Sequence, residues 1–236
     1  MVGALGWGGL AAASLVIGAL LGVVRRWRDG LVGGVLGFGA GALIASVSFE
    51  LAEEGVRVGG PVPVAAGLAV GAIAFYAADR GVDRLGRRSG GGGGAGLPLA
   101  LGALLDGIPE QAVLGIGLAQ GAGVSVALLV AIFVSNLPEG IGSASDMVGA
   151  GRSKRSVIGL WTAVAVLCTL ATLAGFAVAD ATGPSLQAGV DGFAAGALLV
   201  MMVDSMTPEA KAKAQDKAGL ATVLGFALGA GLSLLA

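Results

Sequence analysis

Long runs of apolar residues alternate along this chain with short polar connections. Each run is close to the roughly 20 residues that an α-helix needs to cross the hydrocarbon core of a bilayer. We therefore predict an all-α polytopic membrane protein with eight transmembrane helices in a single domain, residues 1–236. The predicted spans are residues 3–23, 31–51, 61–78, 97–118, 122–145, 156–179, 187–206 and 219–236.

The basic residues lie in alternate connections between these spans. Every Lys and Arg except Arg57 falls in the first, third, fifth or seventh connection. Because cytoplasmic loops carry the excess of Lys and Arg, we predict that these four are cytoplasmic and that both termini are extracytoplasmic. No basic residue precedes the first apolar run, whereas Arg25, Arg26 and Arg28 follow it, which favours a retained helix over a cleaved signal peptide.

Composition excludes several other classes of protein. Hydrophobic residues make up 56% of the chain and charged residues 12%, and the net charge of −1 gives no indication of a nucleic-acid partner. A lone Cys168 and the absence of His exclude an internal disulfide and the usual Cys/His zinc clusters. No nucleophile–base pair is evident, so we expect neither an enzyme nor an organic cofactor.

One predicted connection is long. Residues 79–97 hold a segment rich in Arg and Asp and then the tract SGGGGGAG, which is typical of a flexible linker. We interpret this segment as a cytoplasmic Gly-rich loop that divides spans 1–3, at residues 3–78, from spans 4–8, at residues 97–236.

The second and seventh spans contain similar sequences. GFGAGALIASVSFELAEE (37–54) and GFAAGALLVMMVDSMTPE (192–209) share the pattern G-F-x-A-G-A-L. In the predicted topology the two spans run in opposite directions, so the pattern indicates inverted repeats in a 3+2+3 plan, a feature typical of secondary transporters. Chance similarity between two helices rich in Gly and Ala is the alternative.

Carboxylates occur inside two adjacent predicted spans. The fourth holds D-G-I-P-E-Q, with Asp106 and Glu110, and the fifth holds S-N-L-P-E-G, with Ser135, Asn136 and Glu139. Residues three or four apart share a helix face, and each Pro leaves a backbone carbonyl free to line a cavity. No basic residue within the spans compensates these carboxylates, so the three carboxylates, the Asn136 amide and the Ser135 hydroxyl are together candidate ligands for a divalent cation.

The alternative to a metal site is a bent helix pair whose acids are protonated or bonded to neighbours. Further acids lie near the predicted outer ends of spans, where they either form a mouth that attracts cations or are simply solvated; these are Glu50, Glu53, Glu54, Asp180 and Asp191. Asp146, Asp204 and Glu209 lie at cytoplasmic ends and are candidates for an exit path.

Together, the two P-E motifs and the repeated G-F-x-A-G-A stretches resemble those of the ZIP (Zrt/Irt-like) family of metal-ion transporters. The resemblance implies a binuclear metal site on spans 4 and 5, a homodimer, and metal import across the cell membrane. Asp106 and Ser135 stand where the family motif has His, and Gly107 where Asn is usual. Cys168 and Thr169 align with a Glu-Pro pair of the family's span 6.

The expected function is therefore transport of a divalent metal ion as substrate. Without imidazole ligands the site favours harder cations such as manganese or iron(II), with zinc as the third candidate. Two alternatives stay open at this point. One is a regulatory or otherwise non-transporting relative of the family, and the other is a permease for another cation.

Overall fold

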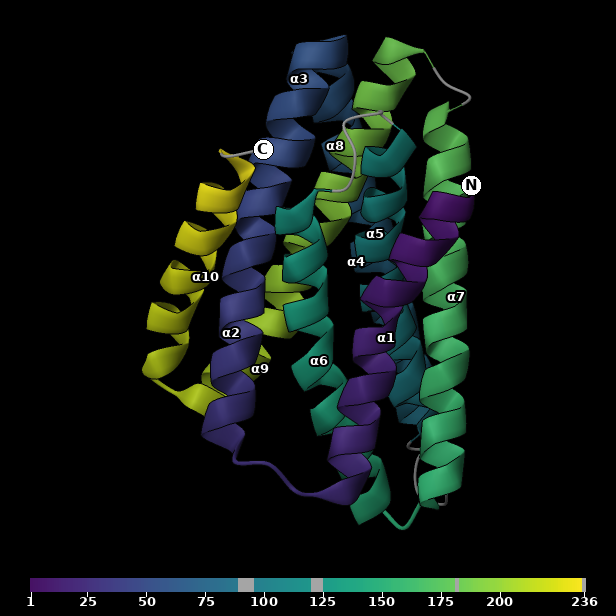
Figure 1. Ribbon diagram of the computed structural model, residues 1–236, viewed down its shortest axis with the longest axis vertical. Helices are drawn as coiled ribbons and strands as arrows, with labels where there is room; N and C mark the ends of the chain where they lie inside the picture. Colours follow the sequence, from purple (N-terminus) through teal and green to yellow (C-terminus); the bar gives the residue numbers. More distant parts are fainter. Residues whose placement is uncertain (89–95, 120–124, 181–182, 235–236) are drawn as a thin grey trace.

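The computed structural model describes residues 1–88, 96–119, 125–180 and 183–234. Every regular element in these ranges is helical, and the helices form one bundle (Figure 1). Two short segments, η1 and η2, are π-helical. In chain order the elements are α1 (Val2–Val24), α2 (Asp29–Ser46), η1 (Val47–Glu53), α3 (Glu54–Gly59), α4 (Pro61–Arg88), α5 (Gly96–Ala119), α6 (Val126–Gly149), α7 (Lys154–Asp180), α8 (Pro184–Met201), η2 (Met202–Met206), α9 (Thr207–Ala214) and α10 (Lys217–Ser233).

Each predicted span corresponds to a helix of the structure, and the differences lie at the ends. The second predicted span continues without a break through η1 and α3 to Gly59, and the seventh continues through η2 and α9 to Ala214. α4 extends to Arg88, so part of the predicted Gly-rich loop is helical. The rest of that loop, residues 89–95, lies outside the described residues.

Six helical segments of the described residues are long and apolar enough to cross a membrane. They are Val2–Val24, Asp29–Gly59, Pro61–Val82, Val126–Gly149, Lys154–Ala179 and Pro184–Ala214. Large apolar side chains such as Leu20, Ile73 and Leu167 face outward from these segments. Because exposed apolar surface on this scale is stable in lipid and not in water, the chain is a multi-pass α-helical membrane protein.

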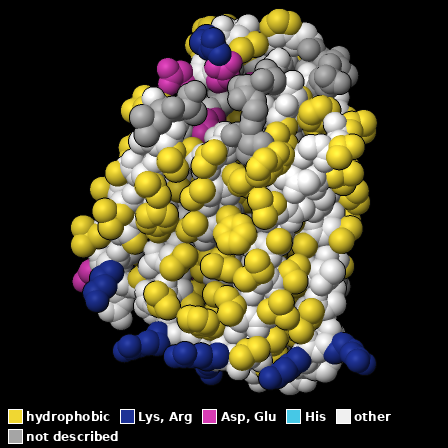
Figure 2. Space-filling model, viewed as in Figure 1, with side chains coloured by type: hydrophobic (Ala, Val, Ile, Leu, Met, Phe, Trp, Pro, Cys, Tyr) yellow, Lys and Arg dark blue, Asp and Glu magenta, His cyan; other side chains and the backbone are white. Residues whose placement is uncertain are grey.

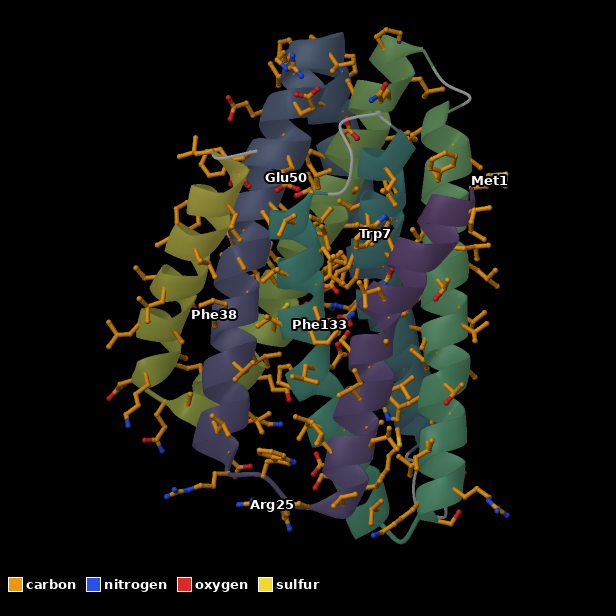
Figure 3. The ribbon with its side chains drawn as sticks, in the orientation of Figure 1. Met1, Trp7, Arg25, Phe38, Glu50 and Phe133 are labelled. Carbon is orange, nitrogen blue, oxygen red and sulfur yellow. The ribbon has the colours of Figure 1, made fainter. Side chains whose placement is uncertain are left out.

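Charged side chains gather at the two ends of the bundle. Figure 2 shows Lys and Arg side chains at one end and an apolar band above them. We call this the basic end; Arg25 lies there, and Glu50 lies near the opposite end (Figure 3). Arg57 pairs with Glu54 at 2.6 Å within α3, which lies at that opposite end (Figure 1). α1 begins and α10 ends away from the basic end (Figure 1). The start of α1 and the end of α10 are therefore separated from the Lys and Arg side chains, as the distribution of basic residues along the sequence predicts.

The helices pack in two matching sets of pairs. α2 packs on α10 and α8 packs on α4; likewise α1 packs on α6 and α7 packs on α5. Within the predicted repeat, α2 corresponds to α8, α1 to α7, and α4 to α10. The contact of α2 with α10 therefore corresponds to that of α8 with α4. The contact of α1 with α6 corresponds to that of α7 with α5.

Glycine allows the close approach in these pairs. A Cβ atom on Gly41 of α2 would collide with the backbone oxygen of Thr222 on α10. In the matching pair, a Cβ atom on Gly196 of α8 would collide with the backbone oxygen of Leu68 on α4. Small residues drive helix association in membranes because they let backbones pack at short distance.

The two π-helical segments begin at the same position of the repeat. Aligning Gly37 with Gly192 places Val47 opposite Met202, and these are the first residues of η1 and η2. π-helical turns are rare and are often found at functional sites. Both segments begin after the shared G-F-x-A-G-A letters.

Candidate functional site

Glu110 lies buried at the contact between α5 and α6. Its side chain is 2% exposed, and its Oε1 atom accepts a hydrogen bond of 3.0 Å from the Ser135 hydroxyl on α6. Ser135 Oγ also lies 3.0 Å from the carbonyl oxygen of Ile132. The structure therefore brings together one polar residue from each of the two P-E motifs, across a separation of 25 residues.

Asn136 and Glu139 continue the polar face of α6. Asn136 is 1% exposed, and its Nδ2 atom has no hydrogen-bond partner among the described residues. Glu139 is half-buried and lies one turn beyond Ser135 on the same face. An amide and two carboxylates at this depth supply oxygen ligands of the kind that divalent cations prefer.

α5 and α6 remain continuous helices through both prolines of the motifs. Pro109 lies inside α5 and Pro138 inside α6. A proline in a helix interior cannot donate to the backbone carbonyl four residues earlier. Such carbonyls are tolerated in a membrane where they face protein or a water-lined cavity.

α7 forms a wall of the site. A Cβ atom on Gly107 would lie 2.7 Å from Cys168 Sγ, so the buried thiol occupies the space that glycine leaves on α5. Cys168 therefore lies against α5 one turn before Glu110.

Gln111 and Thr172 extend the same contact and were not among the predicted site residues. The Thr172 hydroxyl donates to Gln111 Oε1 at 2.7 Å, and both side chains are fully buried. Gln111 Nε2 has no hydrogen-bond partner among the described residues. One feature of the sequence could have indicated Thr172: it lies four residues after Cys168, and therefore on the same face of the helix.

Two observations bear on the predicted metal ligands. The side chain of Asp106 lies outside the described residues, although its backbone is part of α5. In the part of the chain that the structure describes, no group of three or more His, Cys, Asp or Glu side chains is placed to hold a metal ion. Besides carboxylates, the described residues at the contact between α5 and α6 offer the hydroxyl group of Ser135 and the amide group of Asn136.

The predicted outer acids have different surroundings. Glu50, in η1, accepts a hydrogen bond of 2.9 Å from Ser233 of α10, while its Oε2 atom is buried with no hydrogen-bond partner among the described residues. Glu54 is paired with Arg57, Glu53 is exposed and Asp191 is fully buried. Asp180 has a side chain outside the described residues.

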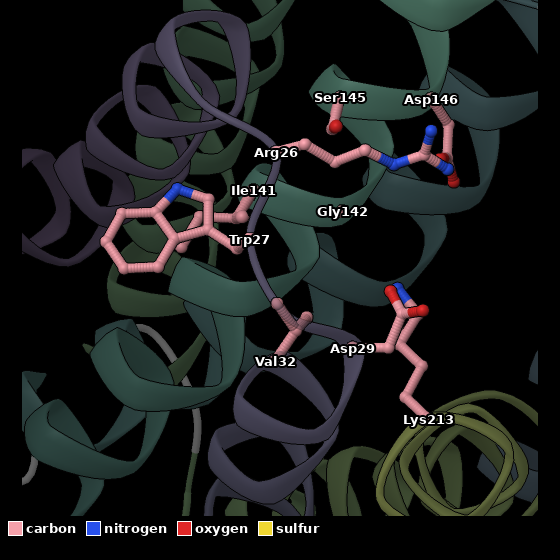
Figure 4. Close-up of a pocket in the computed structure, with 9 residues that line it drawn as sticks. All are labelled: Arg26, Trp27, Asp29, Val32, Ile141, Gly142, Ser145, Asp146 and Lys213. Carbon is pink, nitrogen blue, oxygen red and sulfur yellow. The ribbon is translucent and has the colours of Figure 1, made fainter.

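The predicted acids of the cytoplasmic ends also differ. Asp204 is exposed, and Glu209 pairs with Lys213 at 2.8 Å. Asp146 lines a small cavity at the basic end, together with Arg26, Asp29 and Lys213 (Figure 4). The α6 residues that line this cavity follow Asn136 and Glu139 along the helix, toward the basic end.

The fold and this site together define a multi-pass membrane protein with a buried polar centre between α5, α6 and α7. No protein-family model matches the chain, and no curated protein sequence matches it. The resemblance to the ZIP family therefore rests on the motifs of the chain itself.

Proposed function

We propose that this protein is a ZIP-like transporter that imports a divalent metal ion, namely zinc, manganese or iron(II), across the cell membrane. The observation that carries the proposal is the buried Glu110 carboxylate of α5, hydrogen-bonded to Ser135 of α6, which lies one turn from Glu139 on the same helix face. A carboxylate at the centre of a bilayer is costly unless a cation, a proton or a polar partner stabilises it. A cation passing between α5 and α6 meets that requirement.

Eight spans and extracytoplasmic termini belong to this proposal. The basic end then faces the cytoplasm, and Glu50 lies on the outer side, from which the ion enters. Spans 1–3 and 6–8 form two inverted repeats around α5 and α6. The paired contacts of α2 with α10 and of α8 with α4 support this plan, as do the matching starts of η1 and η2. Moving the repeats against the central pair would expose the site to either side in turn.

The donor set favours a hard or borderline cation. Asp106, Glu110, Ser135, Asn136 and Glu139 offer carboxylate, hydroxyl and amide groups, and the chain has no His. Oxygen ligands suit manganese and iron(II) better than they suit zinc. We therefore expect manganese or iron(II) to compete most strongly for the site.

Uptake into proteoliposomes that contain only this chain tests the proposal. We expect a panel of divalent ions to give saturable uptake, and the double variant Glu110→Gln, Glu139→Gln to abolish it while still reconstituting. Asp216→Asn is the matched control, because it removes one carboxylate that is fully exposed at the basic end. Equal uptake by the double variant and the wild type would contradict the site. Absence of uptake by the wild type for every ion would favour a regulatory role instead.

A further inference from the structure

α6 carries a continuous polar stripe from the candidate site to the basic end. Asn136, Glu139, Ser143 and Asp146 are spaced three, four and three residues apart, so they lie on one face. This stretch of helix is about 15 Å long. Ser143 Oγ is buried and has no hydrogen-bond partner among the described residues. Such a stripe inside an apolar helix is costly unless it borders other polar groups or water.

The stripe ends in a small cavity at the basic end, which we call the inner mouth. Gly142 and Asp146 of α6, Arg26 and Asp29 near the start of α2, and Lys213 of α9 line it. The cavity has a volume of about 30 Å³, which is enough for a water molecule. Figure 4 shows the Arg26 side chain extending toward Asp146 and the Lys213 side chain extending toward Asp29.

Lys213 reaches further into the protein than its neighbour on α9. Its side chain is 22% exposed, against 64% for Lys211 two residues earlier. A Cβ atom on Gly142 would lie 2.8 Å from Lys213 Nζ, so the ammonium group rests against the α6 backbone. A side chain at position 142 would therefore push the ammonium group away from its present place against α6. Glu209 holds it there through the 2.8 Å ion pair.

The stem of Lys213 is also fixed. A Cβ atom on Gly33 of α2 would lie 2.6 Å from Lys213 Cβ, so a second glycine provides the space through which the side chain passes. The Lys213 side chain thus packs against a glycine of α2 at its Cβ atom and a glycine of α6 at its ammonium group, which Glu209 pairs with on α9. This arrangement places a positive charge against α6 at Gly142, three residues beyond Glu139 in the sequence.

We propose that Lys213 is a tethered cation that closes the inner mouth, and that a divalent ion leaving Glu139 must displace its ammonium group. The inference rests on the proposed function, because it assigns the exit side of the same site. Two cations in a space of this size repel each other strongly, since little water is present to screen them. When the Lys213 side chain swings outward with Glu209, the leaving ion meets Asp29 and Asp146, the second of which lies beside Arg26 (Figure 4).

Cysteine accessibility tests the position of Lys213 without requiring transport. The background is Cys168→Ala, which removes the native thiol, and the reporter is Ser143→Cys, a substitution of nearly equal size. A membrane-impermeant methanethiosulfonate that carries a quaternary ammonium is added to the basic end. We expect Lys213→Ala to raise the labelling rate of residue 143 about tenfold, because thiol reactivity follows exposure.

Three matched variants complete the test. Lys211→Ala removes an exposed lysine from the same helix and should leave the labelling of residue 143 unchanged. Lys213→Arg keeps the positive charge and should keep labelling slow. Asp146→Cys, which is exposed at the mouth itself, should be labelled readily in every background. If Lys213→Ala leaves the labelling rate of residue 143 unchanged, while residue 146 reacts normally, the proposal is overturned.

Uptake measurements on the same proteins separate this inference from the proposed function. If Lys213→Ala raises labelling and the wild type takes up divalent ions, both stand. If labelling rises but no divalent ion is taken up by any variant, the proposed function fails while Lys213 still closes the mouth. If uptake proceeds but labelling does not respond, the ion leaves by another path and the role of Lys213 is overturned.

Discussion

The hydroxyl of Ser135 donates a hydrogen bond of 3.0 Å to Oε1 of Glu110. This single contact joins the two P-E motifs across the interface between α5 and α6, and both side chains are 2% exposed. A hydrogen bond to an ionised group contributes more than one between neutral groups, because the charge strengthens it. The bond therefore orients the Glu110 carboxylate toward a fixed position between the two helices.

Ser135→Ala should weaken the binding of the transported ion. Loss of this donor removes about 1.5–3 kcal/mol of stabilisation from the ionised carboxylate and also removes one candidate ligand. We expect the metal concentration for half-maximal uptake to rise about tenfold or more. Ser48→Ala is the control, since Ser48 is exposed and its hydroxyl donates to the Ile44 carbonyl one turn earlier in the chain. An unchanged half-saturating concentration in Ser135→Ala would show that the hydroxyl does not serve the site.

Gly107→Ala should destabilise the protein through Cys168. The added methyl group would lie 2.7 Å from Sγ, and such overpacking costs about 1–3 kcal/mol. Thermal unfolding in detergent micelles should show a lower midpoint for Gly107→Ala. Cys168→Ala should restore most of the loss in the double variant, because it removes the obstructing sulfur.

Gly117→Ala is the matched control for that experiment. It lies on the same helix with nothing within 4 Å of the added atom. If Gly107→Ala and Gly117→Ala shift the midpoint equally, or if Cys168→Ala gives no recovery, the close contact between α5 and α7 is not the cause.

Gly41→Ala should prevent the normal packing of α2 on α10. The new methyl group would overlap the backbone oxygen of Thr222, which cannot rotate away as a flexible side chain can. We expect most of this variant to aggregate on extraction and to be lost from the monodisperse peak in size-exclusion chromatography. Gly34→Ala on the same helix has nothing within 4 Å and should elute as the wild type does. Normal behaviour of Gly41→Ala would contradict the packing of this helix pair.

Labelling of single cysteines should place the basic end in the cytoplasm. In a Cys168→Ala background, Arg57→Cys should react with an impermeant maleimide added to intact cells. Arg155→Cys and Lys211→Cys should react only after the membrane is opened, because they lie in the connections that we assign to the cytoplasm. Reaction of all three positions in intact cells would reject the proposed orientation.

The sequence alone determined where the helices run, and the structure confirms a helix at each predicted span. These features are local: a span requires only a sufficient length of apolar residues, and the distribution of Lys and Arg is visible in the loops. The sequence also singled out Glu110, Ser135 and Asn136, since a polar residue in an apolar run is conspicuous. It placed the boundaries less well, because the helices that end at Gly59, Arg88 and Ala214 continue past the end of the apolar runs.

Only the tertiary structure decided which faces of the helices meet. It placed Cys168 against Gly107, Thr172 against Gln111, and Lys213 against Gly142. None of these pairs is apparent in the sequence, because the lipid and the interior of the bundle are both apolar and neither marks the inward face of a helix. The rotation of each helix is set instead by close packing at glycines and by a few buried polar contacts. Those interactions exist only once the neighbouring helix is in place.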